Sequence, residues 1–195
     1  MQAKEKILLA AERLFAERGL DVSLREIAVA AGQGNHSAVQ YHFDGKAGLI
    51  DALYAHRMTP LNERRRELIG DLRARGLEED LPALVAAYLA PLAEHVLAHP
   101  GTSWYLRFTS RYVLSGGYRS WPYSSDHHPG VAELAALLRR RLPGLTRERL
   151  RVLNLHIVVV LADLEQRLGD PAFDAGRARS AVADLRLTAQ ALLTA

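Results

Sequence analysis

The sequence lacks several features that would point to particular classes of protein. None of its 195 residues is a cysteine, so disulfide bonds and thiolate metal sites are excluded. No apolar run approaches the ~20 residues of a membrane-spanning helix; the densest, residues 155–162, is short and contains a histidine. The N-terminus also lacks the uninterrupted apolar stretch of a signal peptide. We therefore expect a cytoplasmic protein.

Motifs of familiar enzyme classes are missing as well. The chain has no G-x-S-x-G sequence, no Walker phosphate-binding loop and no dinucleotide-binding fingerprint. His95 and His99 share a helix face, where Glu94 or the pair His127 and His128 would have to complete a metal site. Because no H-E-x-x-H pattern or clear third ligand accompanies them, we favour coincidence. The sequence predicts no enzyme, no metal and no cofactor.

Apolar residues recur at helical spacing along most of the chain, with no strand pattern and no internal repeat. The expected fold is therefore all-α. Beyond the first 45 residues, helices are predicted at about 46–57, 80–98, 103–114, 131–142, 146–168 and 174–193. Pro60 should kink the first of these or begin a new helix, and Asp80 should cap the second. Residues 115–130, which contain adjacent glycines and two prolines, are expected to form a long loop.

Residues 24–43, LREIAVAAGQGNHSAVQYHF, have the pattern of a helix, a glycine-containing turn and a second short helix. The sequence S-L-R-E predicts a capping box between Ser23 and Glu26 at the start of the first helix. Gly32 then stands where a left-handed residue would close it, and Asn35 is placed to cap the second. An amphipathic helix over residues 2–18 precedes the pair and can cover it. Such a three-helix head places side chains in the major groove of DNA.

Several motifs in order, EKILLAAERLFAERG, REIA, the glycine turn, YHF and KAGL, make residues 4–53 resemble the DNA-binding head of the TetR family of bacterial regulators. The resemblance implies a helix-turn-helix head, residues 1–45, followed by an antiparallel helical body, residues 46–195, that binds a ligand and forms a dimer. Two positions depart from the common family form. The turn from Gly32 to Asn35 is one residue longer, and Gln40 stands where tyrosine is more usual, so the base-reading register is open by about one residue.

The resemblance also implies which residues meet the operator DNA. Arg25 corresponds to a position that reaches phosphate or a base edge, while His36, Ser37, Ala38 and Gln40 occupy the exposed front of the second helix. Tyr41, His42 and Lys46 match phosphate-contacting positions, and Ser23 and Asn35 complete the predicted DNA-binding set. Alternative structural roles stay open for three of them: Ser37 as a helix-start residue, Tyr41 as packing against the first helix, and His42 as a solvated group.

The head has no excess of positive charge, because its acids and bases balance up to Arg57 although the whole chain is formally +3. Non-specific DNA affinity should therefore be modest, and binding should depend on a local patch and on doubled contacts in a dimer. Arg64, Arg65 and Arg66 form a basic cluster outside the head. They either touch flanking DNA or, as we favour, form a solvated helix face.

The last two predicted helices are candidates for self-association. Their apolar stripes consist of Leu150, Leu153, Ile157, Val160, Leu161 and Leu164 on one and Ala181, Leu185, Leu187, Ala189, Leu192 and Leu193 on the other. In the family, the terminal helices pair with their twofold mates as a four-helix bundle. The competing interpretation is that both stripes belong to the core of a single chain. A twofold homodimer suits a palindromic operator.

Aromatic residues in the middle of the body mark a candidate effector pocket. Apolar cavities with a few convergent polar groups are typical ligand sites. The predicted ligand-binding residues are Tyr88, His95, Trp104, Tyr105, Phe108, Tyr112, Trp121, His156 and Asp163, with Tyr118 and Tyr123 possible neighbours. Ordinary aromatic packing is the alternative for each.

The sequence thus predicts a transcriptional repressor that a small apolar or aromatic effector releases from its operator. Repression is the commoner mode of the family, although activation stays open. A second hypothesis is a DNA-binding regulator whose body docks a partner without a small ligand. A metal-binding or enzymatic helical protein is the least favoured.

Overall fold

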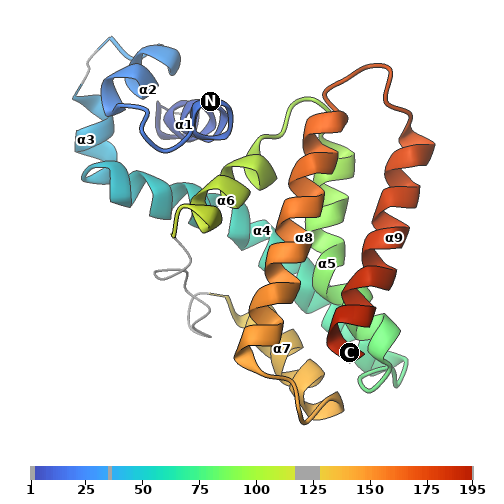
Figure 1. Ribbon diagram of the computed structural model, residues 1–195. Coiled ribbons are helices and arrows are strands. Elements are labelled where there is room, and N and C mark those ends of the chain that lie inside the picture. The colour runs from blue at the N-terminus through green and yellow to red at the C-terminus, as the bar shows by residue number, and fades with distance from the viewer. Residues whose placement is uncertain (1–2, 35–36, 117–127, 195) are drawn as a thin grey trace.

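The computed structural model describes residues 3–34, 37–116 and 128–194, which contain helices and no strand (Figure 1). The helices are α1 (Ala3–Arg18), α2 (Leu24–Ala30), α3 (Ala38–Phe43), α4 (Lys46–Ala74), α5 (Leu81–Ala98), α6 (Tyr105–Leu114), α7 (Pro129–Arg141), α8 (Arg147–Arg167) and α9 (Ala175–Thr194). The predicted all-α fold, with a small head and a helical body, is confirmed.

The head is built from α1, α2 and α3, whose apolar side chains share one core that includes Ile7, Phe15, Ile27 and Val39. The predicted capping box is present: the Glu26 amide donates to the Ser23 hydroxyl oxygen, and Glu26 Oε2 accepts from the Ser23 amide at 2.9 Å. These bonds satisfy amides that the first turn of α2 would otherwise leave unpaired. The Ser23 amide and hydroxyl, which both donate to Glu26 Oε2, together with Arg18 lower the pKa of Glu26 to about 2.

The helix α4 joins the head to the body without interruption, so the expected helix end near residue 57 and the new helix at Pro60 are wrong. Pro60 is exposed, as is His56, so the carbonyl that loses its helical donor can be solvated. At the start of α4, a Cβ on Gly48 would lie 1.9 Å from the Phe43 carbonyl oxygen. Only glycine allows α3 and α4 to approach this closely, which explains the glycine of the KAGL motif.

In the body, α5, α8 and α9 lie side by side, α7 packs on α4 and α5, and α6 lies between α8 and the head (Figure 1). Asp80 caps α5 as predicted, accepting from the Ala83 amide at 2.8 Å. By length and composition α5 is apolar enough to cross a membrane, a property that the sequence analysis overlooked. Since 56% of its residues are buried inside the protein and it packs on four other helices, α5 is a core helix.

Most of the predicted self-association stripe lies in the core of the chain itself. Leu153, Ile157, Leu161 and Leu185 are fully buried. The alternative interpretation, that both helices use these residues internally, therefore holds for most of the stripe. The large apolar residues that α8 and α9 leave exposed are Val152, Val159 and Leu187.

Candidate DNA-binding face and body cavity

The helices α2 and α3 present a polar and aromatic surface on the side away from the head core. Arg25, Ser37 and Gln40 are exposed, and Tyr41, at 85%, is the most exposed of the large hydrophobic side chains that the structure describes. Tyr41 therefore does not pack against α1, and its ring lies edge-on to that of His42, with centroids 5.2 Å apart. Val39 and Phe43 point the other way, into the core. The short helix α3 thus has one buried face, which packs in the head core, and one solvent-exposed face.

The start of α3 differs from the prediction. Ser37 occupies its N-cap position and makes no side-chain capping bond. Asn35 and His36, predicted as the cap and as a base-reading residue, lie outside the described residues. At the other end of the preceding turn, Gly32 adopts φ +68, the left-handed conformation expected of a residue that follows a helix.

Lys46 begins α4 beside this surface. Its Nζ donates to the Leu20 carbonyl oxygen at 2.8 Å, a bond that ties the start of α4 to the segment between α1 and α2. His42 is half-buried at the end of α3. Lys46 at the start of α4 and Arg25 of α2 thus supply cationic side chains on the elements that border this face.

The helix α6 connects this head to the body. The Phe108 ring stacks on Phe15 of α1, with centroids 5.8 Å apart, and on Tyr112 of α6, with centroids 6.1 Å apart. Arg111 Nε donates to the Ala16 carbonyl oxygen at 2.8 Å. Movement of α6 must therefore be transmitted to α1.

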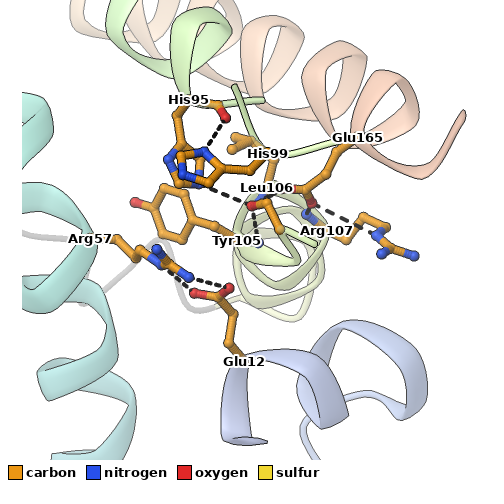
Figure 2. A network of polar contacts seen from close by, with 9 residues as sticks. Glu12, Arg57, His95, His99, Tyr105, Leu106, Arg107 and Glu165 are labelled. Carbon is orange, nitrogen blue, oxygen red and sulfur yellow. Dashed lines mark hydrogen bonds and ion pairs between the residues drawn. The ribbon is translucent and has the colours of Figure 1, made fainter. Parts of the chain in front are cut away.

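A buried ion pair joins α1 to α4 in the same region (Figure 2). Arg57 donates from Nε and Nη2 to the two Glu12 oxygens at 2.6 and 2.8 Å. The Glu12 side chain is 2% exposed and that of Arg57 is 19% exposed. Burial alone would lower the pKa of Arg57, but the hydrogen bonds and charge of Glu12 raise it above its usual value. The Arg57 guanidinium thus binds both carboxylate oxygens of a head residue and joins α4 to α1.

Glu165 of α8 caps α6 from a distance in sequence (Figure 2). Its carboxylate accepts from the Ser103 hydroxyl at 2.6 Å and from the Leu106 and Arg107 amides at 3.3 and 3.0 Å. These are amides that the first turn of a helix leaves unpaired, and the N-cap residue Trp104 does not bond them. Burial raises the pKa of Glu165, although the three hydrogen bonds oppose this change.

His95 of α5 lies against this network. Its Nε2 is 3.0 Å from the Ser103 hydroxyl, and its own carbonyl oxygen is 2.8 Å from Nδ1 of His99. Burial, with smaller contributions from the positive charges of Arg57 and His99, lowers the pKa of His95 to about 4. Within the described residues, no group of three His, Asp or Glu side chains is placed to hold a metal ion.

The body contains a cavity of about 40 Å³ between α4, α5, α6, α7 and α8. Its walls are mainly apolar or aromatic, with Arg65, Thr109, His128 and Asn154 as polar members. The Tyr88 hydroxyl donates to Asn154 Oδ1 at 3.0 Å. A space of this size holds a few water molecules or one small chemical group.

Of the residues predicted to bind an effector, Tyr88 and Tyr105 line this cavity. Phe108 stacks on Phe15 of α1 instead, Tyr112 stacks on Phe108, and the Trp104 ring lies under the Arg107 guanidinium, 3.9 Å from its Cζ. The other described candidates bond elsewhere: His95 to Ser103, His156 to Thr188 of α9, and exposed Asp163 to Arg167. Trp121, Tyr118 and Tyr123 lie outside the described residues.

The sequence analysis missed Arg65, because it treated the three arginines as one surface cluster. Arg65 is 4% exposed, whereas Arg64 pairs with Glu94 and Glu67 on the surface and Arg66 is exposed. Helical spacing could have predicted its burial, since Arg65 stands four residues after Leu61 and four before Ile69, both of which are buried.

Residues 7–53 match the family model described as bacterial regulatory proteins, tetR family. This part of the chain therefore has the DNA-binding domain of that family. The protein is a DNA-binding transcriptional regulator, and the members of this family bind DNA and act as dimers. No curated protein matches the chain.

Among solved structures, the chain is similar to the fatty acid degradation regulator FadR from Bacillus halodurans. The identity is 18% over 97% of this chain and 96% of that one, with a TM-score of 0.56, which shows a common fold. Weaker matches are a TetR-family regulator, SCO0857, from Streptomyces coelicolor A3 (23% identity, 99% and 95% covered, TM-score 0.42) and a mutant of HlyIIR (21%, 100% and 97%, 0.44).

Proposed function

We propose that this protein is a cytoplasmic homodimeric repressor that releases its operator when a small molecule binds in the body. The observation that carries this proposal is the open face of α3 in a head of the TetR family, connected through α6 to a cavity in the body. The residues proposed to contact DNA are Ser23, Arg25, Asn35, His36, Ser37, Ala38, Gln40, Tyr41, His42 and Lys46.

The chemistry of this set suits sequence reading. Gln40 can bond adenine N6 and N7, and Ala38 can touch a thymine methyl group. Arg25 and Lys46 can donate to phosphate and set the register. Because the head has balanced charge, these few contacts must supply most of the affinity of each subunit.

The dimer is proposed to form through α8 and α9. Val152, Val159 and Leu187 are apolar and exposed on these helices, and His156 bonds Thr188 between them at 2.7 Å. A twofold interface here would place two like heads on the two half-sites of a palindrome.

Regulation would act through α6. Tyr105 and Leu106 line the cavity, and Phe108 stacks on α1 one turn later. A ligand that fits one position of α6 better than another would therefore change the tilt of α4 and the separation of the heads. The equilibrium can shift only by the difference in affinity of the ligand for the two states.

Genomic DNA fragments selected with the purified protein test the proposal. We expect a palindromic site whose affinity falls steeply as salt rises, because phosphate contacts release counterions. Gln40→Ala should lose preference at one base pair of each half-site, at a cost of about 1–3 kcal/mol. Glu63→Ala, an exposed residue of α4 outside the head and the proposed dimer helices, is the control and should bind normally.

Other results would favour the alternatives. A monomer by sedimentation at micromolar concentration, or a flat response to salt, would contradict the operator-binding dimer. Operator binding that no compound or cell extract changes would favour a regulator whose body docks a partner. A melting temperature raised by zinc or nickel would support the metal-binding interpretation.

A further inference from the structure

Arg65 is a buried cation on the wall of the body cavity without an acidic partner among the described residues. Its side chain is 96% buried, and Nε and Nη1 have no hydrogen-bond partner there. The backbone of α7 closes over it, since a Cβ on Gly130 would lie 2.9 Å from Cβ of Arg65 and 3.1 Å from the Asn62 carbonyl oxygen. The first turn of α7 therefore packs directly on the base of the Arg65 side chain.

Among the described residues, the titratable groups around Arg65 offer it no negative charge. The titratable neighbours that act on it are the phenols of Tyr54, Tyr88 and Tyr105. Burial raises the pKa of Tyr88 and of Tyr105, so both hydroxyls are neutral at physiological pH. Burial also lowers the pKa of Arg65, but a guanidinium stays charged in proteins. Within the part of the chain that the structure describes, Arg65 is thus a charge without a counterion.

An uncompensated buried charge weakens a fold, and packing alone does not require one. A methionine of similar length would fill the same space, and replacing buried charges by apolar residues of similar volume is often neutral or stabilising. An arginine at this position is best explained by an anion that it binds. Arginine favours carboxylates, because its planar guanidinium can donate parallel hydrogen bonds to the two oxygens.

The remaining lining residues of the cavity indicate the chemistry of the ligand beyond its carboxylate. Leu92, Leu106, Val131 and Val158 are apolar, and Asn154 adds a polar group already bonded to Tyr88. The volume of about 40 Å³ admits a carboxylate group directly and a larger body only if α6 or α7 shifts. Such a shift is what a regulatory ligand needs to produce.

We propose that Arg65 binds the carboxylate of a small aromatic or apolar acid whose ring or chain lies against the apolar walls of the body cavity. In this protein the acid is the effector, a role that rests on the proposed function above. Binding gives Arg65 its counterion and displaces the cavity wall formed by α6.

The test uses full-length protein and two pairs of probes, benzoate with benzamide and phenylacetate with phenylacetamide. Each pair has nearly the same shape and differs in charge. A ligand at about 100 times its Kd should raise Tm by several degrees. We expect the two acids to do so and the neutral amides and inorganic phosphate to have at least a tenfold weaker effect.

Arg65→Met removes the proposed contact, and Arg66→Met is the matched control on the exposed neighbour. R65M should abolish the response to the acids and leave Tm at or above that of the unmodified protein. R66M should keep the full response. If R65M fails to fold, Arg65 is a structural residue and the stability argument is overturned, while the comparison of acids with amides still tests binding in the unmodified protein.

Three further results would overturn the proposal: equal effects of acids and amides, a full acid response in R65M, or no response to either acid at millimolar concentration. A counterion from the chain itself is tested by Asp126→Asn, the one acid in residues 117–127. If D126N lowers Tm and creates acid binding that the unmodified protein lacks, Arg65 is paired internally and the ligand is excluded.

Operator binding separates this proposal from the proposed function. Acid binding without any operator would leave the anion site intact and remove its role as effector site. Operator binding without acid binding would leave the regulator intact and remove the anion site.

Discussion

Two arginines of α4, eight residues apart, lie in opposite electrostatic surroundings. Arg57 is fixed by both oxygens of Glu12 at the junction with the head, whereas Arg65 lines the body cavity with no carboxylate among the described residues beside it. A buried guanidinium is stable when its charge and donors are matched and costly when they are not. The paired arginine therefore indicates a structural joint, and the other indicates a place that binds something.

The largest expected loss of stability comes from removing the negative charge that pairs with Arg57, which leaves Arg57 unpaired like Arg65. Glu12→Gln leaves Arg57 buried without an opposite charge, so the free energy of unfolding should fall by about 3 kcal/mol. Urea denaturation measures the change. Glu17→Gln is the control, because Glu17 also lies on α1 but pairs with Arg13 on the surface at 3.8 Å; its cost should be below about 1 kcal/mol.

A double variant sharpens this prediction. Glu12→Leu combined with Arg57→Met replaces the pair by apolar groups and should recover most of the stability lost in E12Q. A double variant as unstable as E12Q would mean that the geometry of the pair, rather than its charge balance, holds α1 on α4.

The next largest effect is a loss of stability in acid, caused by His95 near Arg57. The ordinary pKa of histidine is 6.5 and that of His95 in the folded protein is about 4. Between these values the unfolded chain takes up a proton that the folded chain excludes, so stability is lost as pH falls from 6.5 towards 4. Thermal melts across this range should show a smaller loss for His95→Gln. His56→Gln, an exposed histidine on α4, should retain the loss, and identical profiles for H95Q and the unmodified protein would contradict the assignment.

A smaller effect is expected on the cavity side. Tyr88→Phe removes the hydroxyl that bonds Asn154 and should lower the free energy of unfolding by about 1 kcal/mol. Tyr41→Phe, on the exposed face of α3, should not change it measurably. A loss above about 3 kcal/mol in Y88F would show that the polar wall of the cavity is as rigidly coupled as the Glu12–Arg57 joint.

The smallest effect is expected at Arg64, the exposed neighbour of Arg65. Its ion pairs with Glu94 and Glu67 are short, 2.8 and 3.0 Å, but solvent screens both. Arg64→Met should therefore change stability by less than about 1 kcal/mol. A larger loss by calorimetry would indicate that these ion pairs act as a network between α4 and α5.

The sequence was most informative where local rules decide the structure. The capping box at Ser23 and Glu26, the left-handed Gly32 and the cap at Asp80 depend on residues a few positions apart, and each was predicted. Pro60 was misjudged because a proline normally ends a helix, while here the packing of α4 on α5 and α7 maintains it. The N-cap at Asn35 was also misplaced, since Ser37 holds that position.

The candidate sites divide in the same way. The open face of α3 followed from helical spacing and the family resemblance. The cavity did not, because its walls come from five helices and no local pattern records which aromatic residues meet. Phe108 illustrates this: the aromatic cluster suggested a pocket, but its partner is Phe15, more than ninety residues earlier.

The cap that Glu165 provides for α6 has a consequence for the folding of the chain. The Leu106 and Arg107 amides bond a carboxylate nearly sixty residues later, so the first turn of α6 exists only while α8 is in place. Because α6 also stacks on α1, loss of α8 would expose the head core as well. Hydrogen exchange at these two amides should therefore require global unfolding, and the head and the body should melt together in one cooperative transition despite the boundary proposed at residue 45.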